Sequence, residues 1–491
     1  MKHLVTSLLF LLTISVYAQK NSLLERSFWK SNPSLAIVQE EVRKGNNPSE
    51  SNSNAFDPTV LAINEGASNE VIKYLLNQPG NDVNKITHDQ RTYIFWSAYK
   101  GNVELMDYLK SKGAKTNLYD SKGYSILTFA ASAGQPNTKV YDFCIKAGIN
   151  PKNDFDTEGA NALLLVAPFD KDLTIIDYFV SKGLDIKSVD AKGNTAFNYA
   201  AKGGNIPTLK NLIAKDVKYN DNAMIMASSG TRGTSNTLEV YQYLESLNIK
   251  PTAIGQNGEN VLHNLVRKEK QGDLINYFIS KGVNVNLPDN EGNTPFMNAA
   301  SANKDVQIIT LLLSKVKDIN AKNSKGVTAL AFAVKNNSPE IIKYLIDKGA
   351  DITAVDNAGE NLASYLFQSY ELAKKDIFDE KLNLLEQKGF DFKKTQKNGN
   401  TLYHLAVSKN DVTLLHTIER FKANVNAKNE DGNTALHKAA MVAQNTEVLK
   451  YLIGIGAKKD IKTNFKETAY NLAAENEFLT KNKVDIDFLK S

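Results

Sequence analysis

The 491-residue sequence is poor in the residues that build covalent links and metal sites, with one cysteine, Cys144, and six histidines. A single cysteine excludes an intramolecular disulfide, so burial and hydrogen bonding must hold the fold, and a chain of this length can bury enough apolar surface. No two histidines stand at metal-ligand spacing and no cysteine cluster occurs. We interpret Cys144 as a small buried side chain.

Motifs of catalytic and phosphate-binding sites are also lacking. The sequence contains no glycine-rich phosphate loop and no Gly-x-Ser-x-Gly segment, and its glycines recur instead at turn positions. The net charge of +5 is spread along the chain without a run of five like charges, so we expect no nucleic-acid binding. We therefore expect a protein that is not an enzyme and that needs no cofactor and no metal.

Long hydrophobic runs are lacking beyond the first residues. An apolar run over residues 4–16 follows Lys2 and precedes Ala18, a pattern typical of a secretory signal. The run is too short to span a bilayer. We predict a signal peptide over residues 1–18, no membrane insertion, and an exported protein in the periplasm of a Gram-negative bacterium, or alternatively a secreted one.

What the sequence does contain is a repeated unit, seen clearly over residues 289–322. A turn containing Gly292 precedes Thr294, which stands at an N-cap position, and Pro295, which suits the first residue of a helix. Two short apolar helices are predicted to follow, and one unit cannot cover its own apolar face, so units must stack. Most steps between equivalent positions are 33 to 36 residues long, and these positions are Thr92, Ser125, Asn161, Thr195, Asn260, Thr328, Asn361, Thr401, Thr434 and Thr468.

Residues 432–440, GNTALHKAA, resemble the signature of ankyrin repeats, and residues 344–352 resemble the end of the second helix of that repeat. The resemblance extends over nearly all of residues 57–491 and implies an all-α ankyrin-repeat solenoid of about 13 helix-turn-helix units. A degenerate unit is expected over residues 222–249. Residues 19–56 are interpreted as an N-terminal capping segment and connector, and the truncated last unit as a C-terminal cap.

Two residue types receive a structural interpretation from this resemblance. His263, His404 and His437 occupy the histidine position of the repeat, where the imidazole usually bonds neighbouring backbone. The aspartates that open the turns, such as Asp190, Asp289 and Asp356, are expected to cap the local backbone.

We predict the partner-binding surface in the N-terminal repeats, because aromatic residues and arginine are typical of binding hot spots. Phe155 and Phe169 follow this patch, and an alternative for Trp96 is that it fills the core between repeats. Tyr99 and Tyr124 are expected to be exposed. The predicted residues are Arg91, Tyr93, Trp96, Tyr99, Lys100, Lys122 and Tyr124.

The resemblance implies a monomeric, non-catalytic scaffold that binds a protein partner along a long concave surface. An alternative is a dedicated inhibitor, immunity protein or protective partner of one exported toxin or enzyme. The family resemblance alone does not choose between the two.

Overall fold

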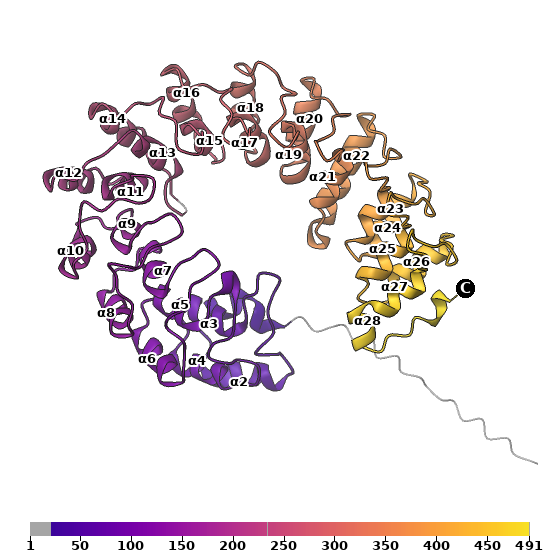
Figure 1. Ribbon diagram of the computed structural model, residues 1–491, viewed down its shortest axis with the longest axis horizontal. Helices are drawn as coiled ribbons and strands as arrows, with labels where there is room; N and C mark the ends of the chain where they lie inside the picture. The colour runs from indigo at the N-terminus through magenta and orange to yellow at the C-terminus, as the bar shows by residue number, and fades with distance from the viewer. Residues whose placement is uncertain (1–20, 233, 491) are drawn as a thin grey trace, which may run out of the picture. The chain divides into compact units, whose positions relative to one another are not determined.

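The computed structural model describes residues 21–232 and 234–490, which fold into helices joined by turns (Figure 1). The predicted signal peptide, residues 1–18, lies outside the described residues. The chain divides into two compact units, one ending at Ala223 and the other beginning at Met224, and each is described by itself. Within the described ranges, extended pairing is confined to isolated bridges in the turns.

The N-terminal unit contains short helices in antiparallel pairs, and in each pair the first helix is almost fully buried. A capping segment comes first, with η1 (Ser22–Leu24), α1 (Arg26–Lys30) and α2 (Leu35–Arg43). The pairs are α3 (Pro58–Glu65) with α4 (Asn69–Leu76), α5 (Tyr93–Tyr99) with α6 (Val103–Ser111), α7 (Ile126–Ser132) with α8 (Thr138–Lys146), α9 (Ala162–Val166) with α10 (Thr174–Ser181), and α11 (Ala196–Gly203) with α12 (Ile206–Ala214); η2 (His88–Gln90) lies in the turn before α5.

The C-terminal unit continues the same pattern. Its pairs are α13 (Asn222–Ser229) with α14 (Leu238–Ser246), α15 (Val261–Leu265) with α16 (Gly272–Ser280), α17 (Pro295–Ala302) with α18 (Val306–Leu313), α19 (Ala329–Asn336) with α20 (Pro339–Asp347), α21 (Leu362–Gln368) with α22 (Lys375–Gln387), α23 (Leu402–Val407) with α24 (Val412–Glu419), α25 (Ala435–Val442) with α26 (Glu447–Gly454), and α27 (Ala469–Glu475) with α28 (Glu477–Lys481). Shorter 3₁₀ segments are η3 (Leu372–Lys374) and η4 (Asp487–Leu489). From α3 to α28 the described residues form 13 pairs, which confirms the predicted all-α solenoid.

The marker residues found in the sequence are the N-caps of first helices. Thr294 caps α17 through its hydroxyl, which accepts a hydrogen bond from the Met297 amide, and Asp57 caps α3 through its carboxylate, which accepts from the Val60 amide. The other ten markers from Thr92 to Thr468 occupy the same position in their own units. The extended backbone of the turn therefore changes to helix at the residue that the sequence pattern predicts.

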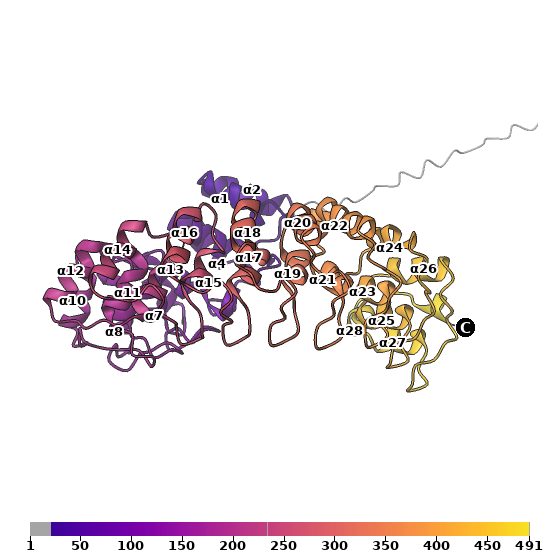
Figure 2. The same ribbon diagram turned by 90° about the horizontal axis from the view of Figure 1, so that it is seen from above.

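Each cap follows a tight turn, which we call a finger. In the finger before α17, Asp289 Oδ1 accepts from the amides of Glu291 (3.0 Å) and Asn293 (2.8 Å), and Gly292 has a φ of 80°. Asp190 and Asp356 bind their own turns similarly, which confirms the predicted role. Figure 2 shows the turns before α19 and α21 extending from the same edge of the C-terminal unit.

Three histidines, one in each of three units, connect their own unit to the next one. His404 Nδ1 accepts from the Thr401 amide (3.1 Å), and its Nε2–H donates to the Asn433 carbonyl of the following unit (2.9 Å). His263 and His437 make equivalent bonds. This pairing requires a neutral ring with the proton on Nε2, and burial lowers the pKa of all three imidazoles. The structural interpretation of these histidines is confirmed.

The degenerate unit is a helix pair without a regular finger. Its first helix, α13, lies where the chain divides into two units. The carbonyls at the end of α13 are bound by Lys268 Nζ, at 3.0 Å from Ser228 O and 2.8 Å from Ser229 O. A lysine from the next unit thus supplies the donors for the last two carbonyls of α13.

We predict that the chain unfolds in at least two steps, separating near α13. Stability of a repeat array is close to a sum of local and nearest-neighbour terms, so the unit with the fewest regular contacts should open first. Hydrogen exchange measured across a urea series should show the lowest protection over residues 222–250. Uniform protection over residues 57–490 with a single sharp transition would contradict this.

We also predict that mild acid weakens the C-terminal unit selectively. The buried histidines have a lowered folded-state pKa, so as pH falls through their ordinary value of about 6.5 the unfolded chain takes up protons first and stability is lost. In the N-terminal unit burial instead raises the pKa of Asp154, Asp156 and Asp170, which stabilises that unit as these groups protonate.

Urea unfolding followed by hydrogen exchange at pH 7.5 and 5.5 measures this difference. Protection in α15–α28 should fall more than protection in α3–α12, and His437→Gln should reduce the pH dependence. An equal loss in both units would show that the histidines do not control the acid response.

Candidate functional site

The structure corrects part of the predicted partner-binding patch. Arg91, Tyr93 and Trp96 are buried, with at most 6% of each residue exposed, so a partner cannot cover them as surface side chains. Tyr99 and Tyr124 are half-buried rather than exposed, whereas Lys100 and Lys122 are exposed.

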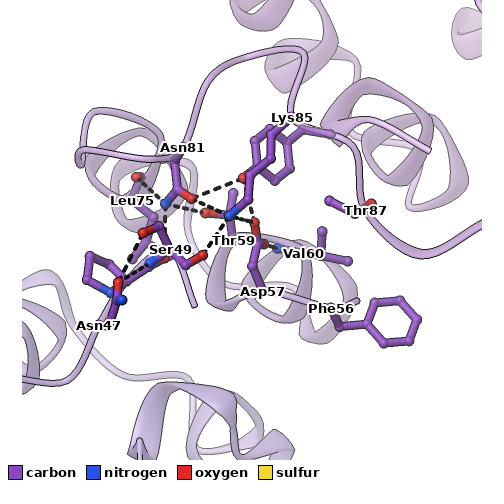
Figure 3. Close-up of polar contacts among 12 residues, drawn as sticks. Asn47, Ser49, Phe56, Asp57, Thr59, Val60, Leu75, Asn81, Lys85 and Thr87 are labelled. Atoms are coloured by element: carbon purple, nitrogen blue, oxygen red, sulfur yellow. Dashed lines mark hydrogen bonds and ion pairs between the residues drawn. The ribbon is translucent and has the colours of Figure 1, made fainter. Parts of the chain in front are cut away.

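Tyr93 belongs to a buried polar network around Asp57. The Tyr93 hydroxyl donates to Asp57 Oδ2 (2.6 Å), and the same carboxylate pairs with Lys85 Nζ (2.8 Å). Burial, followed by the charge of Asp57, raises the pKa of the Tyr93 phenol. Figure 3 shows Asp57, Asn81 and Lys85 pointing toward one another.

The same network fastens the N-terminal connector to the first repeat. Lys85 Nζ donates to Ser49 O (2.8 Å), and Asn81 Nδ2 donates to Pro48 O (3.0 Å) and Leu75 O (2.9 Å). Asp57 is fully buried, so removing Lys85 would leave its charge without an ion pair in the interior and destabilise the protein. Tyr93 is therefore a structural residue.

Arg91 and Trp96 fill the interface between the second and third repeats. The Arg91 guanidinium binds Asp120 Oδ2 (2.7 Å) and Asp89 Oδ2 (3.1 Å) and lies 4.0 Å from the Phe129 ring centroid. The Trp96 indole N–H donates to Thr87 Oγ1 (2.9 Å). The alternative noted for Trp96, a place in the core between repeats, is correct.

The other predicted residues remain at the surface but are held by neighbours. Tyr99 on α5 stacks on Phe129 of α7, with ring centroids 5.9 Å apart, and Lys100 lies over the Tyr99 ring. Lys122 pairs with Asp89 (2.8 Å). Tyr124 lies in the finger before α7, where burial and then the nearby Asp156 raise the pKa of its phenol.

A different set of side chains is exposed in the N-terminal unit, and the patch prediction missed all of it but Phe155. Each member directly precedes the residue that opens a finger, and each is a large apolar residue. We call this set the finger stripe; its exposed fractions are 65% for Ile86, 60% for Tyr119, 46% for Phe155 and 52% for Val189. The sequence itself shows this pattern, because a large apolar residue stands directly before each of Thr87, Asp120, Asp156 and Asp190.

The members of the finger stripe share one register on consecutive fingers. Phe155 and Val189 each form an isolated bridge to the N-cap six residues later, Asn161 and Thr195. Neighbouring fingers are joined by hydrogen bonds from Ser121 N to Asp89 O (2.8 Å) and from Ala191 N to Glu158 O (2.9 Å). The four side chains therefore form a row across the turns.

The fingers of the C-terminal unit do not continue such a row. Only Ile254 and Val355 are large exposed apolar residues at the equivalent position. The remaining fingers carry Pro288, Lys322, Thr395, Lys428 and Lys462 there. An uninterrupted apolar row is thus a feature of the N-terminal unit.

The stripe borders a small cavity of about 200 Å³, lined by Leu118, Tyr119, residues 147–150 and Asp154. Asp154 accepts from the Ser125 hydroxyl (2.5 Å), and burial raises the pKa of this carboxyl. Small-molecule sites usually enclose about 300–1,000 Å³, so this depression suits a protruding side chain better than a whole ligand.

The part of the chain that the structure describes lacks two further features. It contains no group of three histidine, cysteine, aspartate or glutamate side chains placed to hold a metal ion. Over the same residues, no helix combines the length and the apolar character needed to cross a bilayer.

Several known proteins resemble this chain over part of their length. Alpha-latroinsectotoxin-Lt1a of Latrodectus tredecimguttatus is 24% identical over 442 residues, which cover 83% of this chain and 29% of the toxin. A palmitoyltransferase of Lachancea kluyveri is 28% identical over 215 residues (42% and 28%). Human transient receptor potential cation channel subfamily A member 1 is 24% identical over 312 residues (62% and 25%). The chain spans less than a third of each of these relatives.

The family comparison agrees with the helix pairs and the fingers. Models of ankyrin repeats match residues 31–120, 59–154, 262–356, 372–463 and 404–486, and a further ankyrin-repeat model matches residues 164–213. These spans include most of both units and more than half of the chain. The chain belongs to the ankyrin-repeat family, and as a member of it presents a scaffold for binding protein.

Proposed function

We propose that this chain is a monomeric, non-catalytic scaffold that binds its protein partner through the finger stripe of the N-terminal unit. The observation that carries the proposal is the row of four exposed apolar side chains, Ile86, Tyr119, Phe155 and Val189, on consecutive fingers. Contiguous exposed apolar surface is rare on soluble proteins and marks interaction sites. The buried histidines are occupied by bonds between units, which supports a role without chemistry.

The fingers suit this role because they are already ordered. Asp120, Asp156 and Asp190 bind the amides of their own turns, and neighbouring turns bind one another. Ordering a flexible loop on binding costs free energy, which a rigid finger avoids. Full burial of a large apolar side chain contributes about 1.5–3 kcal/mol, and these side chains are only about half exposed, so several of them must act together in a stable complex.

We propose further that the protein acts outside the cytoplasm, in the periplasm or as a secreted protein. The support is the basic, apolar and small-residue pattern of residues 1–18. The single cysteine, Cys144, is buried, so its unpaired thiol is shielded in an oxidising compartment.

A dedicated inhibitor or immunity protein is the narrower form of the same proposal. In that form one exported toxin or enzyme would occupy the stripe, whereas a general scaffold would bind several partners. Both forms use the same surface, and the number of partners captured separates them.

We predict that Tyr119→Ser combined with Phe155→Ser reduces partner capture at least tenfold. Both side chains are largely exposed, so the melting temperature should change by only about 1–2 °C, whereas an interface hot spot is worth more than about 1 kcal/mol. Crosslinking capture from the exported fraction of the source organism measures the effect. Val355→Ser, at the equivalent position of a C-terminal finger, is the matched control, and equal capture by the double variant would place binding elsewhere.

The export proposal predicts that the mature chain begins at Gln19. Intact-mass analysis of protein purified from its own organism should give the mass of residues 19–491. A dominant species that retains residues 1–18 would contradict both the signal peptide and the proposed location.

A further inference from the structure

The cavity beside Tyr119 contains a buried carboxylate without a charged partner. Asp154 lines this cavity and is only 3% exposed. Its Oδ2 accepts a hydrogen bond from the Ser125 hydroxyl (2.5 Å), whereas its Oδ1 accepts none from the described residues. Burial raises the pKa of this carboxyl, the Ser125 hydroxyl opposes the shift, and no lysine or arginine of the described residues forms an ion pair with it.

The other buried aspartates among the described residues have stronger partners. Asp57 and Asp120 each form an ion pair. Asp170 and Asp190 each accept hydrogen bonds from two backbone amides. A buried carboxylate is costly unless it is paired and hydrogen-bonded. Asp154, which has one hydroxyl, therefore lacks a donor that the fold supplies to each of the others.

The place of Asp154 in the repeat does not require a carboxylate. Asp154 stands seven residues before its N-cap, Asn161. The equivalent position of the other units with a marked N-cap, from the second unit to the last, is apolar, small or basic: Lys85, Leu118, Ser188, Ala253, Leu287, Ala321, Ala354, Lys394, Ala427 and Ile461. The repeat folds without an acid here, so a structural requirement does not explain Asp154.

The lysines near the cavity are directed elsewhere. Lys182 pairs with Asp142 (2.8 Å). Lys152 lies against Gly183, where an added Cβ would be 2.4 Å from its Cε. The charge of an exposed lysine is screened by salt, whereas a buried carboxylate in contact with a cation is screened much less. The missing donor for Asp154 must therefore come from another molecule.

The chemistry of the cavity favours a primary ammonium group as that donor. A calcium ion takes six to eight oxygen ligands, and Asp154 is the one carboxylate among the described residues that line the cavity. A guanidinium group binds best through both oxygens of a carboxylate, but Oδ2 is already occupied by Ser125. An ammonium group is a compact point charge, and the remaining oxygen is enough to bind it.

The walls of the cavity suit the stem of a lysine side chain. Leu118, Ala147 and Ile149 line the cavity beside Asp154. Lysine carries its ammonium group on four carbons that can lie along apolar surface. Tyr119, which also lines the cavity, belongs to the finger stripe, so a molecule on the stripe can reach Asp154. The volume of about 200 Å³ has room for one side chain.

We propose that this cavity receives a lysine side chain of the protein partner, with the lysine ammonium group bound to Asp154 and its stem against Leu118 and Ile149. The proposal rests on the proposed protein-binding function and adds a specific contact to it. The finger stripe supplies apolar surface, and the cavity supplies selectivity for a lysine at one place in the partner.

Three capped amino acids test the cavity in the full chain: Nα-acetyl-lysine methylamide and its norleucine and arginine counterparts. Each is titrated at pH 7.5 while backbone amide shifts are followed by NMR. We expect the lysine compound to give saturable shifts confined to residues 116–119 and 147–154, and to bind at least tenfold more tightly than the norleucine compound, which lacks the charge. Equal binding of the norleucine or the arginine compound would overturn the assignment, and this comparison uses the unaltered chain.

Asp154→Asn removes the charge and keeps nearly the same shape. It should weaken the lysine compound at least tenfold without lowering the melting temperature by more than about 1–2 °C, because an unpaired buried carboxylate does not stabilise the fold. Asp142→Asn, on the neighbouring helix α8, is the matched control and should leave binding of the lysine compound unchanged. A melting temperature lowered by many degrees in Asp154→Asn would show that the carboxylate is a structural residue, and the proposal would be wrong.

Partner capture separates this inference from the proposed function. Asp154→Asn should reduce capture, as Tyr119→Ser with Phe155→Ser does. If the double variant loses capture while the lysine compound fails to bind, the lysine assignment is wrong and the scaffold function stands. If the lysine compound binds at Asp154 but Asp154→Asn captures the partner normally, the occupant is a free amine, and the assignment to the partner is wrong.

Discussion

Each unit of this chain depends on its neighbour for hydrogen bonds that it cannot make itself. The carbonyls that end a first helix have no partner within that helix. Asn303 Nδ2 donates to Val266 O and Lys268 O of the preceding unit, and Asn337 Nδ2 donates to Ala300 O and Asn303 O. Because a buried unpaired carbonyl is costly, one unit removed from the array would leave its neighbour unsatisfied as well as uncovered.

The unit of α21 and α22 shows what happens when this asparagine is missing. A longer connection replaces the usual loop, and Lys381 of α22 takes the place of the amide, donating from Nζ to Val334 O (2.9 Å). Lys381 is only 4% exposed, and burial lowers the pKa of its ammonium group to about 8. The carbonyl has a hydrogen-bond donor, but that donor is a buried charge instead of a neutral amide. The position therefore requires a donor, while the residue that supplies it can differ.

Local signals in the sequence predicted the fold well, whereas contacts between units decided the burial of the predicted site. Thr294 and its equivalents cap helices because capping needs only the residue and its next three amides. Arg91 and Tyr93 carry the composition of a hot spot, but their partners Asp120 and Asp57 lie about 30 residues away, and residue type alone does not show that pairing. The finger stripe is defined by its position within the repeat, and a prediction based on residue type alone does not use that position.

The second helices and the N-terminal fingers differ in the kind of side chain that they leave exposed. On the second helices, long side chains pair across neighbouring units: Lys73 with Glu104, Lys281 with Glu245, and the Tyr451 hydroxyl with Glu419. Such polar pairs add little stability each, but they leave a hydrated surface with few apolar groups to attract a partner. On the N-terminal fingers the aspartates accept hydrogen bonds from the amides of their own turns, and the apolar side chains of the finger stripe are exposed. Under the proposed function, a partner that gains free energy by covering apolar surface would bind the fingers rather than the second helices.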